Sequence, residues 1–237
     1  MKKKYIYFLI SISLFIFLLL ILILSPWLNI KEIGLNGLKR VENNEIIREL
    51  GLEKETNLLA FSKIGAKIKL KKNNYIKNVK IKKVYPNKII FNIEERELAG
   101  YIPYINDYLY IDKDGFIVDI KPNFIENLPI IEGLEFDKFV LGKTLEIDDK
   151  EAFNIVMNFT NILIEKDINQ YILKIDVSNL EDIHLHIKGI DVVFGNGEDM
   201  NLKINTLIEV FKNIPENQKG ILYINDTSIN PVLKLIT

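Results

Sequence analysis

Twenty consecutive residues without a charge, Tyr5 to Leu24, constrain this chain more than any other feature of its sequence. Sixteen of them are Ile, Leu or Phe, and two serines are the distinctly polar exceptions. As an α-helix the stretch would be about 30 Å long, which matches the hydrocarbon core of a bilayer. Residues 5–27 are therefore predicted to form one transmembrane helix, with Pro26 as a helix stop and Trp27 as an interfacial aromatic residue.

A cleaved signal peptide is the alternative to an anchor. Its apolar stretch would be roughly 7–15 residues long and would end at small residues, whereas Ser25-Pro26-Trp27 is a poor cleavage site. Lysines at positions 2, 3 and 4 precede the helix, and the positive-inside rule keeps them in the cytoplasm. We therefore expect residues 1–4 to be a cytoplasmic tail and everything after Trp27 to lie outside the cytoplasm.

Charge divides the remainder of the chain into two blocks. Residues 29–96 contain 16 Lys/Arg and 8 Asp/Glu, whereas residues 97–237 contain 12 and 24. Opposite net charges on consecutive blocks predict two folded domains, residues 28–96 and residues 97–237.

Composition excludes several classes of function. The net charge of −1 gives no bulk cationic field for nucleic acid, and the absence of cysteine removes disulfides, thiolate metal sites and cysteine nucleophiles. Two histidines are too few for a multi-histidine metal centre.

The first block has the pattern of a strand, two helices and two further strands. Asn43 or Asn44 is the predicted cap of the first helix, and Gly51 is its stop. The second helix is predicted to carry its apolar residues on one side and its lysines on another. The apolar residues are Phe61, Ile64 and Ile68, and the lysines are Lys63, Lys67 and Lys71. Two such helices can cover one face of a three-stranded sheet.

The second block is richer in strands, so the whole chain is predicted to be α+β. Helices are expected over residues 150–165 and 202–211. The expected strands are residues 108–112, 116–120, 128–131, 172–177, 183–187, 191–194 and 221–225.

This order of elements, together with several short motifs, resembles the FtsQ/DivIB family of bacterial cell-division proteins. The strongest match is Tyr85-Pro86-Asn87 followed by a strand that ends in Glu94-Glu95-Arg96. Other matching segments are residues 33–37, 41–46, 57–59, 74–76, 110–115, 128–133, 193–195 with Lys203, and 220–224. The resemblance implies one anchor, a POTRA domain (β-α-α-β-β) at residues 28–96, and a mixed α/β "FtsQ-type" β-domain at residues 97–237.

The resemblance also implies a function and a binding site. The chain is expected to be a non-enzymatic protein of the division septum, anchored in the cell membrane, that stabilises the division complex and helps to regulate septal peptidoglycan synthesis. Its partners would be FtsB/DivIC-type and FtsL-type coiled-coil proteins, with FtsW/FtsI-type synthases as further candidates. Binding would use a C-terminal edge strand. The strand is Ile221, Leu222, Tyr223, Ile224 and Asn225, although the family often has an acidic residue where Tyr223 stands.

Few residues point to chemistry, and no cofactor, metal, nucleic acid or small-molecule substrate is expected. His184 and His186 would share one face of a strand. This arrangement is either a pair of metal ligands or part of a solvated strand face. No serine stands in a nucleophile-elbow or Ser-x-x-Lys motif. The alternatives to a scaffold are a cell-wall-acting protein and a chaperone-like module that holds extended peptides, both anchored in the membrane.

A lysine-rich stretch of the first domain is open to two interpretations. It is either a solvated polar face or a surface attracted to anionic lipid headgroups or teichoic acids. Lys80, Lys82 and Lys83 are the residues selected to test that attraction, because reversal of their charge should weaken association at low salt.

Overall fold

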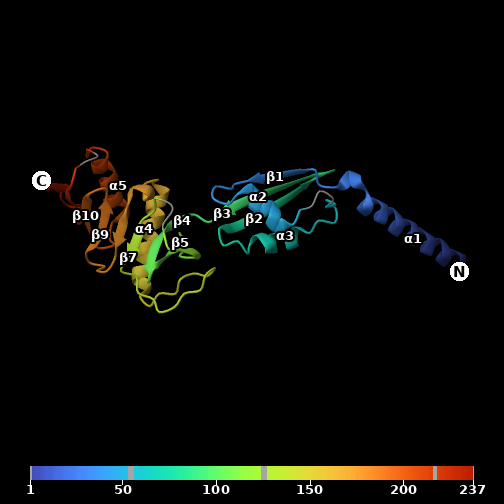
Figure 1. The fold of residues 1–237 in the computed structure, drawn as a ribbon, viewed down its shortest axis with the longest axis horizontal. Coiled ribbons are helices and arrows are strands. Elements are labelled where there is room, and N and C mark those ends of the chain that lie inside the picture. The colour runs from blue at the N-terminus through green and yellow to red at the C-terminus, as the bar shows by residue number, and fades with distance from the viewer. Residues whose placement is uncertain (1, 53–55, 124–126, 216–217, 237) are drawn as a thin grey trace. The chain divides into compact units, whose positions relative to one another are not determined.

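The computed structural model describes residues 2–52, 56–123, 127–215 and 218–236. The chain divides into two compact units, Met1–Glu95 and Arg96–Thr237 (Figure 1). Both units combine helices with β-sheet, so the α+β class predicted from the sequence is confirmed.

The first unit begins with α1 (Lys2–Leu24), an apolar helix. Its window Lys4–Ile21 is long and apolar enough to cross a membrane, with a mean hydropathy of 2.3 and no part buried in the protein. The single apolar helix expected near the N-terminus is therefore present. A short 3-10 helix, η1 (Pro26–Leu28), follows, and the Ser25 hydroxyl accepts a hydrogen bond from the amide of Trp27.

Three strands and two helices make up the rest of the first unit, in the predicted order. They are β1 (Glu32–Asn36), α2 (Asn43–Leu50), α3 (Lys63–Leu70), β2 (Ile76–Val84) and β3 (Lys88–Glu95). Within the described residues the sheet order is β1-β3-β2, with β1 parallel and β2 antiparallel to the central β3. Ile89, Phe91 and Ile93 of β3 alternate into the core, as a strand with one covered face requires.

The two helices bury small stretches of their surfaces against this core. Ile46 and Leu50 of α2 are buried, and Gly51 ends the helix in the left-handed region at φ 63°. The N-cap of α2 is Glu42, so the predicted caps Asn43 and Asn44 are wrong by one or two positions.

The buried side of α3 differs from the side that the sequence pattern indicates. Ala66 and Leu70 are buried, whereas Ile64 and Ile68 are 74% and 61% exposed. The expected grouping of Phe61 with these two isoleucines is therefore wrong. Phe61 precedes the helix and packs edge-on against Phe91, with ring centroids 6.1 Å apart.

The second unit is built on a nine-stranded sheet within the described residues, in the order β12-β11-β10-β9-β8-β7-β4-β5-β6. The strands are β4 (Leu98–Tyr104), β5 (Asp107–Asp112), β6 (Ile117–Lys121), β7 (Ile130–Glu132), β8 (Lys174–Asp176), β9 (Ile183–Ile187), β10 (Ile190–Gly195), β11 (Gly220–Tyr223) and β12 (Val232–Leu235). The strand numbers fall from β12 to β7 and then rise from β4 to β6, so segments far apart in sequence form one continuous sheet.

Helices α4 (Lys150–Glu165) and α5 (Met200–Phe211) pack on this sheet, and the short η2 (Asn169–Tyr171) follows α4. The Asp149 side chain caps α4 by accepting hydrogen bonds from the amides of Glu151 and Ala152. Phe159 of α4 meets Phe194 of β10 with ring centroids 4.7 Å apart, which joins helix and sheet in one core.

Two strands, β4 and β12, were not predicted, and one of them corrects the predicted edge strand. β11 contains the first three residues of the expected edge, Ile221 to Tyr223, but it lies between β10 and β12. The strand at that end of the sheet is β12, which begins directly after Pro231.

The boundary between the units falls between two charged residues with separate roles. The Glu95 carboxylate accepts hydrogen bonds from the amides of residues 39, 40 and 41, in the loop before α2. Arg96 contacts the buried Asp112 at 2.7 Å and lies 3.5 Å from the ring centroid of Phe116. Each residue therefore stabilises its own unit.

Candidate partner-binding surfaces

The main chain of the predicted binding strand, residues 221–225, is already paired. On one side the amides of Gly220 and Ile224 donate to carbonyls of Gly189 and Val193, at 3.2 and 3.1 Å. On the other side, β11 is antiparallel to β12. Leu222 is 1% exposed and Ile224 is 4% exposed, so these side chains belong to the core. Residues 221–223 thus lie between β10 and β12 and cannot accept an added strand on either side.

Among the described residues no strand pairs with the far side of β12, and the register of β12 identifies which of its backbone groups face outward. The amide of Ile236 donates to the carbonyl of Lys219 at 3.0 Å, which makes these two residues a hydrogen-bonded pair. Because such pairs alternate in antiparallel sheets, Val232 and Lys234 also face β11. The N–H and C=O groups of Leu233 and Leu235 therefore point away from β11.

Side chains along this edge are apolar and exposed to an unusual degree. Val232 is 45%, Leu235 54% and Ile236 60% exposed, while Leu233 packs against the core. Pro231 has no amide hydrogen and falls at an outward-facing position, where a strand edge tolerates proline. A strand end with outward polar groups and exposed apolar side chains is suited to pairing with another chain.

The turn before β12 and the strand below it hold the edge in place. The Asp226 carboxylate accepts hydrogen bonds from the side chain and amide of Ser228, which lower the pKa of Asp226. The Lys234 ammonium lies 4.7 Å from the ring centroid of Tyr223, a diagonal neighbour on β11. These contacts fix β12 against β11 without using the outward groups of Leu233 and Leu235.

The two histidines lie on β9 and face the polar side of the sheet. His184 Nδ1 is 3.1 Å from Asp191 Oδ1, its Nε2 is 3.5 Å from Asp182 Oδ2, and His186 Nδ1 is 3.3 Å from Asp191 Oδ1. Burial opposes the charged form, yet the carboxylates of Asp191 and Asp182 raise the pKa of His184 above its ordinary value. This cluster is a set of histidine–carboxylate contacts, and among the described residues no group of three or more ligands arranged for a metal is present.

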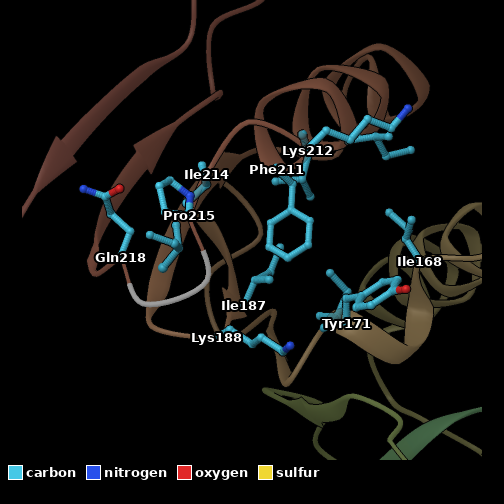
Figure 2. A pocket seen from close by; sticks show the side chains of 13 residues that line it. Ile168, Tyr171, Ile187, Lys188, Phe211, Lys212, Ile214, Pro215 and Gln218 are labelled. Carbon is cyan, nitrogen blue, oxygen red and sulfur yellow. The ribbon is translucent and has the colours of Figure 1, made fainter.

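An apolar cavity of about 410 Å³ opens beside the turn that joins β9 to β10, near the C-terminal end of α5. In Figure 2 the Phe211 ring of α5 projects into it toward Tyr171 and Ile187, and the Phe211 and Tyr171 ring centroids are 6.1 Å apart. The polar groups of the described lining come from Tyr171, Lys188, Lys212 and Gln218, and the rest is largely aliphatic or aromatic. Such a lining is suited to apolar side chains.

The three lysines selected from the first unit do not form one surface. Lys80 and Lys82 are exposed on the face of β2 that points away from the helices. Lys83 alternates to the opposite face, where its Nζ donates to the Leu59 carbonyl at 3.1 Å. Burial and the nearby Lys63 ammonium lower the pKa of Lys83. Period-two alternation places Lys83 apart from the other two, so their grouping was wrong.

Sequence reasoning missed β12, although a signal for it exists. Asn225-Asp226-Thr227-Ser228 is a turn sequence, and residues 232–235 (Val-Leu-Lys-Leu) follow the proline with one polar position. A segment of four residues at the end of a chain is too short for periodicity to distinguish a strand from an irregular tail.

Comparisons with known proteins agree with this architecture. The family model for the FtsQ-type POTRA domain matches residues 28–96. A protein of Clostridium botulinum named "Cell division protein DivIB" is 30% identical over 189 residues, covering 79% of this chain and 73% of that protein. Proteins of the same name from Clostridium tetani (26% over 187 residues, 78% of this chain and 70% of that protein) and Listeria monocytogenes (28% over 206 residues, 84% and 71%) are also similar.

Proposed function

The chain belongs to the DivIB family of cell-division proteins, and from that premise we propose that it is a non-enzymatic scaffold of the division septum. The observation that carries the proposal is the open edge of β12, where the main chain of Leu233 and Leu235 faces outward beside exposed apolar side chains. A surface of this kind binds polypeptide segments by strand addition. The proposal therefore keeps the expected mode of binding but moves it from residues 221–225 to residues 232–236.

Strand addition would proceed through the main chain first. The N–H and C=O groups of Leu233 and Leu235 would pair with a partner strand, extending the sheet beyond β12. The side chains of Val232 and Leu235 would then be covered by the partner, because neighbouring strands lie about 4.8 Å apart. Main-chain pairing supplies affinity, and these side chains select the register.

The proposed partners follow from the family resemblance. They are FtsB/DivIC-type and FtsL-type coiled-coil division proteins, with FtsW/FtsI-type synthases as further candidates. Through these partners the chain would stabilise the septal complex and help to regulate septal peptidoglycan synthesis.

Membrane anchoring by α1 would set both the location and the effective concentration of the scaffold. Lys2, Lys3 and Lys4 favour a cytoplasmic N-terminus, which would put the two units on the outer side of the cell membrane. Confinement of partners to the same bilayer raises their effective concentration, so weak contacts at several sites can add to stable assembly.

A single proline substitution in β12 tests strand addition directly. Leu235→Pro removes an outward amide hydrogen, whereas Leu235→Ala keeps the amide and removes the same exposed side chain. We expect Leu235→Pro to weaken co-purification of the full chain with its DivIC-type and FtsL-type partners by about tenfold or more. Leu235→Ala should weaken it much less.

The fold of each variant would be checked by amide hydrogen exchange in β9 and β10, which neither substitution touches. Equal binding by Leu235→Pro and wild type, with those strands intact, would reject the β12 edge as the binding site.

A further inference from the structure

Helix α3 presents an apolar pair on the side that faces away from the core. Ile64 and Ile68 are four residues apart, so they lie one above the other on the same face of the helix. They are 74% and 61% exposed, whereas Ala66 and Leu70 on the opposite face are buried. Because isoleucine side chains gain from leaving water, this face is suited to an apolar environment that the rest of the unit does not supply.

Positive charge surrounds this apolar pair. Residues 63–88, from the start of α3 to the start of β3, contain ten lysines and no acidic residue. Lys63, Lys67 and Lys71 are exposed on or directly after α3, and Lys83 lies close enough to Lys63 for the two charges to repel. Apolar side chains flanked by lysines are typical of helices that lie in a membrane interface.

Hydrogen bonds hold the start of α3 close to the point where the chain leaves the anchor helix. The Asn57 side-chain amide donates to the Ser25 carbonyl at 3.4 Å, and the Leu58 amide donates to the Leu28 carbonyl at 2.7 Å. Ser25 directly follows α1, and Lys63 lies six positions after Asn57. The start of α3 therefore lies within about 30 Å of the end of the anchor, whatever the path between them.

We propose that α3 docks the first unit onto an anionic lipid leaflet. Ile64 and Ile68 enter the headgroup region, and Lys63, Lys67 and Lys71 contact lipid phosphates. The proposal rests on the membrane anchoring described above but not on strand addition at β12. It favours lipid over a soluble polyanion because a polyanion would engage the lysines and leave the two isoleucines in water.

Docking of this kind is favoured by tethering. An eight-residue helix with two exposed isoleucines would bind a membrane weakly on its own, but the anchor holds it at the surface. Each lysine near an anionic surface changes the ratio of docked to undocked molecules by about fivefold. Exposed Trp27, at the exit of the anchor, is an interfacial residue type that fits the same location.

The experiment uses a spin label, since the chain contains no cysteine of its own. Ile64→Cys carries the label in the full chain, reconstituted into vesicles of phosphatidylcholine with or without phosphatidylglycerol. Leu202→Cys is the matched control, because Leu202 is 52% exposed on α5 in the second unit. The measurement compares collisions of the label with oxygen, which dissolves in lipid, and with a water-soluble nickel complex.

In vesicles that contain phosphatidylglycerol, the label at position 64 should become severalfold less accessible to the nickel complex than in phosphatidylcholine alone. The label at position 202 should remain in water in both. Lys67→Gln with Lys71→Gln should lower the ratio of docked to undocked molecules by about 25-fold.

The matched charge control is Lys80→Gln with Lys82→Gln, which removes two exposed lysines from the opposite side of the sheet. This pair should change the ratio by about twofold or less, because charges farther from the bilayer than the Debye length of about 8 Å are screened.

Three outcomes would overturn the proposal. One is a label at position 64 that stays in water in anionic vesicles. A second is equal protection in both kinds of vesicle, which would indicate contact with a second copy of the chain. The third is an equal effect of the two lysine pairs, which would indicate bulk charge rather than a docking face. Because no partner protein is present, none of these results bears on β12.

Discussion

The two units of this protein expose apolar side chains in different settings, although each has a well-packed core of its own. In the first unit the exposed isoleucines stand on a helix among lysines, and the block is net basic. In the second unit the exposed apolar side chains stand on a strand edge beside outward main-chain groups, and the block is net acidic.

The difference indicates two kinds of binding partner. Side chains on a helix offer apolar surface and charge but no free main chain, so they suit a lipid surface or a groove. A strand edge offers main-chain hydrogen bonds, which only another polypeptide can satisfy in register. Under the two proposals, one chain would bind a membrane with its first unit and a protein with its second.

Substitution at the boundary should separate the stabilities of the two units, and this is the largest effect we expect. Arg96→Ala leaves the 1%-exposed carboxylate of Asp112 without its cation, which should cost the second unit about 3–5 kcal/mol. Glu95→Ala removes the acceptor of the amides before α2 and should instead destabilise the first unit, by about 1–3 kcal/mol. Amide hydrogen exchange, resolved by unit, measures both.

If either variant destabilised both units to the same extent, the chain would unfold as one cooperative body. The two units would then not be energetically independent.

Truncation of side chains on the two faces of α3 should change the stability by very different amounts. Leu70→Ala creates a cavity in the core and should lower the free energy of unfolding by about 2–5 kcal/mol. Ile68→Ala removes an exposed side chain and should change it by about 0.5 kcal/mol or less. Chemical denaturation of the full chain in detergent, monitored by hydrogen exchange of the α3 amides, provides the measurement. A large loss of unfolding free energy for Ile68→Ala would show that its side chain is part of the core.

Protonation of His184 gives the smallest effect and belongs to the second unit alone. Its pKa is raised in the folded protein because Asp191 and Asp182 outweigh burial, so protonation stabilises the fold. The contribution is complete below the unfolded pKa of about 6.5 and is lost as pH rises through the higher folded value. We expect a change of less than about 1 kcal/mol between pH 5.5 and pH 8.

The control is His184→Asn, in which the stability of the second unit should lose this pH dependence. A dependence that persisted in the variant would have to come from other groups.

Much of the fold could be predicted from the sequence because its elements have strong local signals. The 20-residue apolar run predicts α1, and the alternation of Ile89, Phe91 and Ile93 predicts β3. The helix expected over residues 150–165 matches α4, although its cap is Asp149 and not the expected Asp148.

The errors occurred where tertiary contacts override local pattern. The helical period groups Ile64 with Ile68 but does not say which side of an eight-residue helix meets the sheet. Here the smaller Ala66 allows the closer approach. β4 was missed because it contains Gly100 and Pro103, residues more typical of turns. Gly100 is needed there, since a Cβ would lie 2.6 Å from the Pro129 carbonyl oxygen.

The candidate binding site could be predicted only in kind. Edge strands are defined by the absence of a neighbour, and no local pattern records which strand ends a sheet. Leu222 and Leu233 are both leucines that alternate with more exposed neighbours, yet one lies inside the sheet and the other on its last described strand. The register, rather than the composition, distinguishes them.

Exchange of individual backbone amides in β12 tests the central claim most directly. In the isolated full chain, the amides of Val232, Lys234 and Ile236 face β11 and should exchange slowly, while those of Leu233 and Leu235 should exchange rapidly. On addition of a DivIC-type partner, the amides of Leu233 and Leu235 should become protected. Tight binding of the partner with these two amides still exchanging at their free rates would contradict the account.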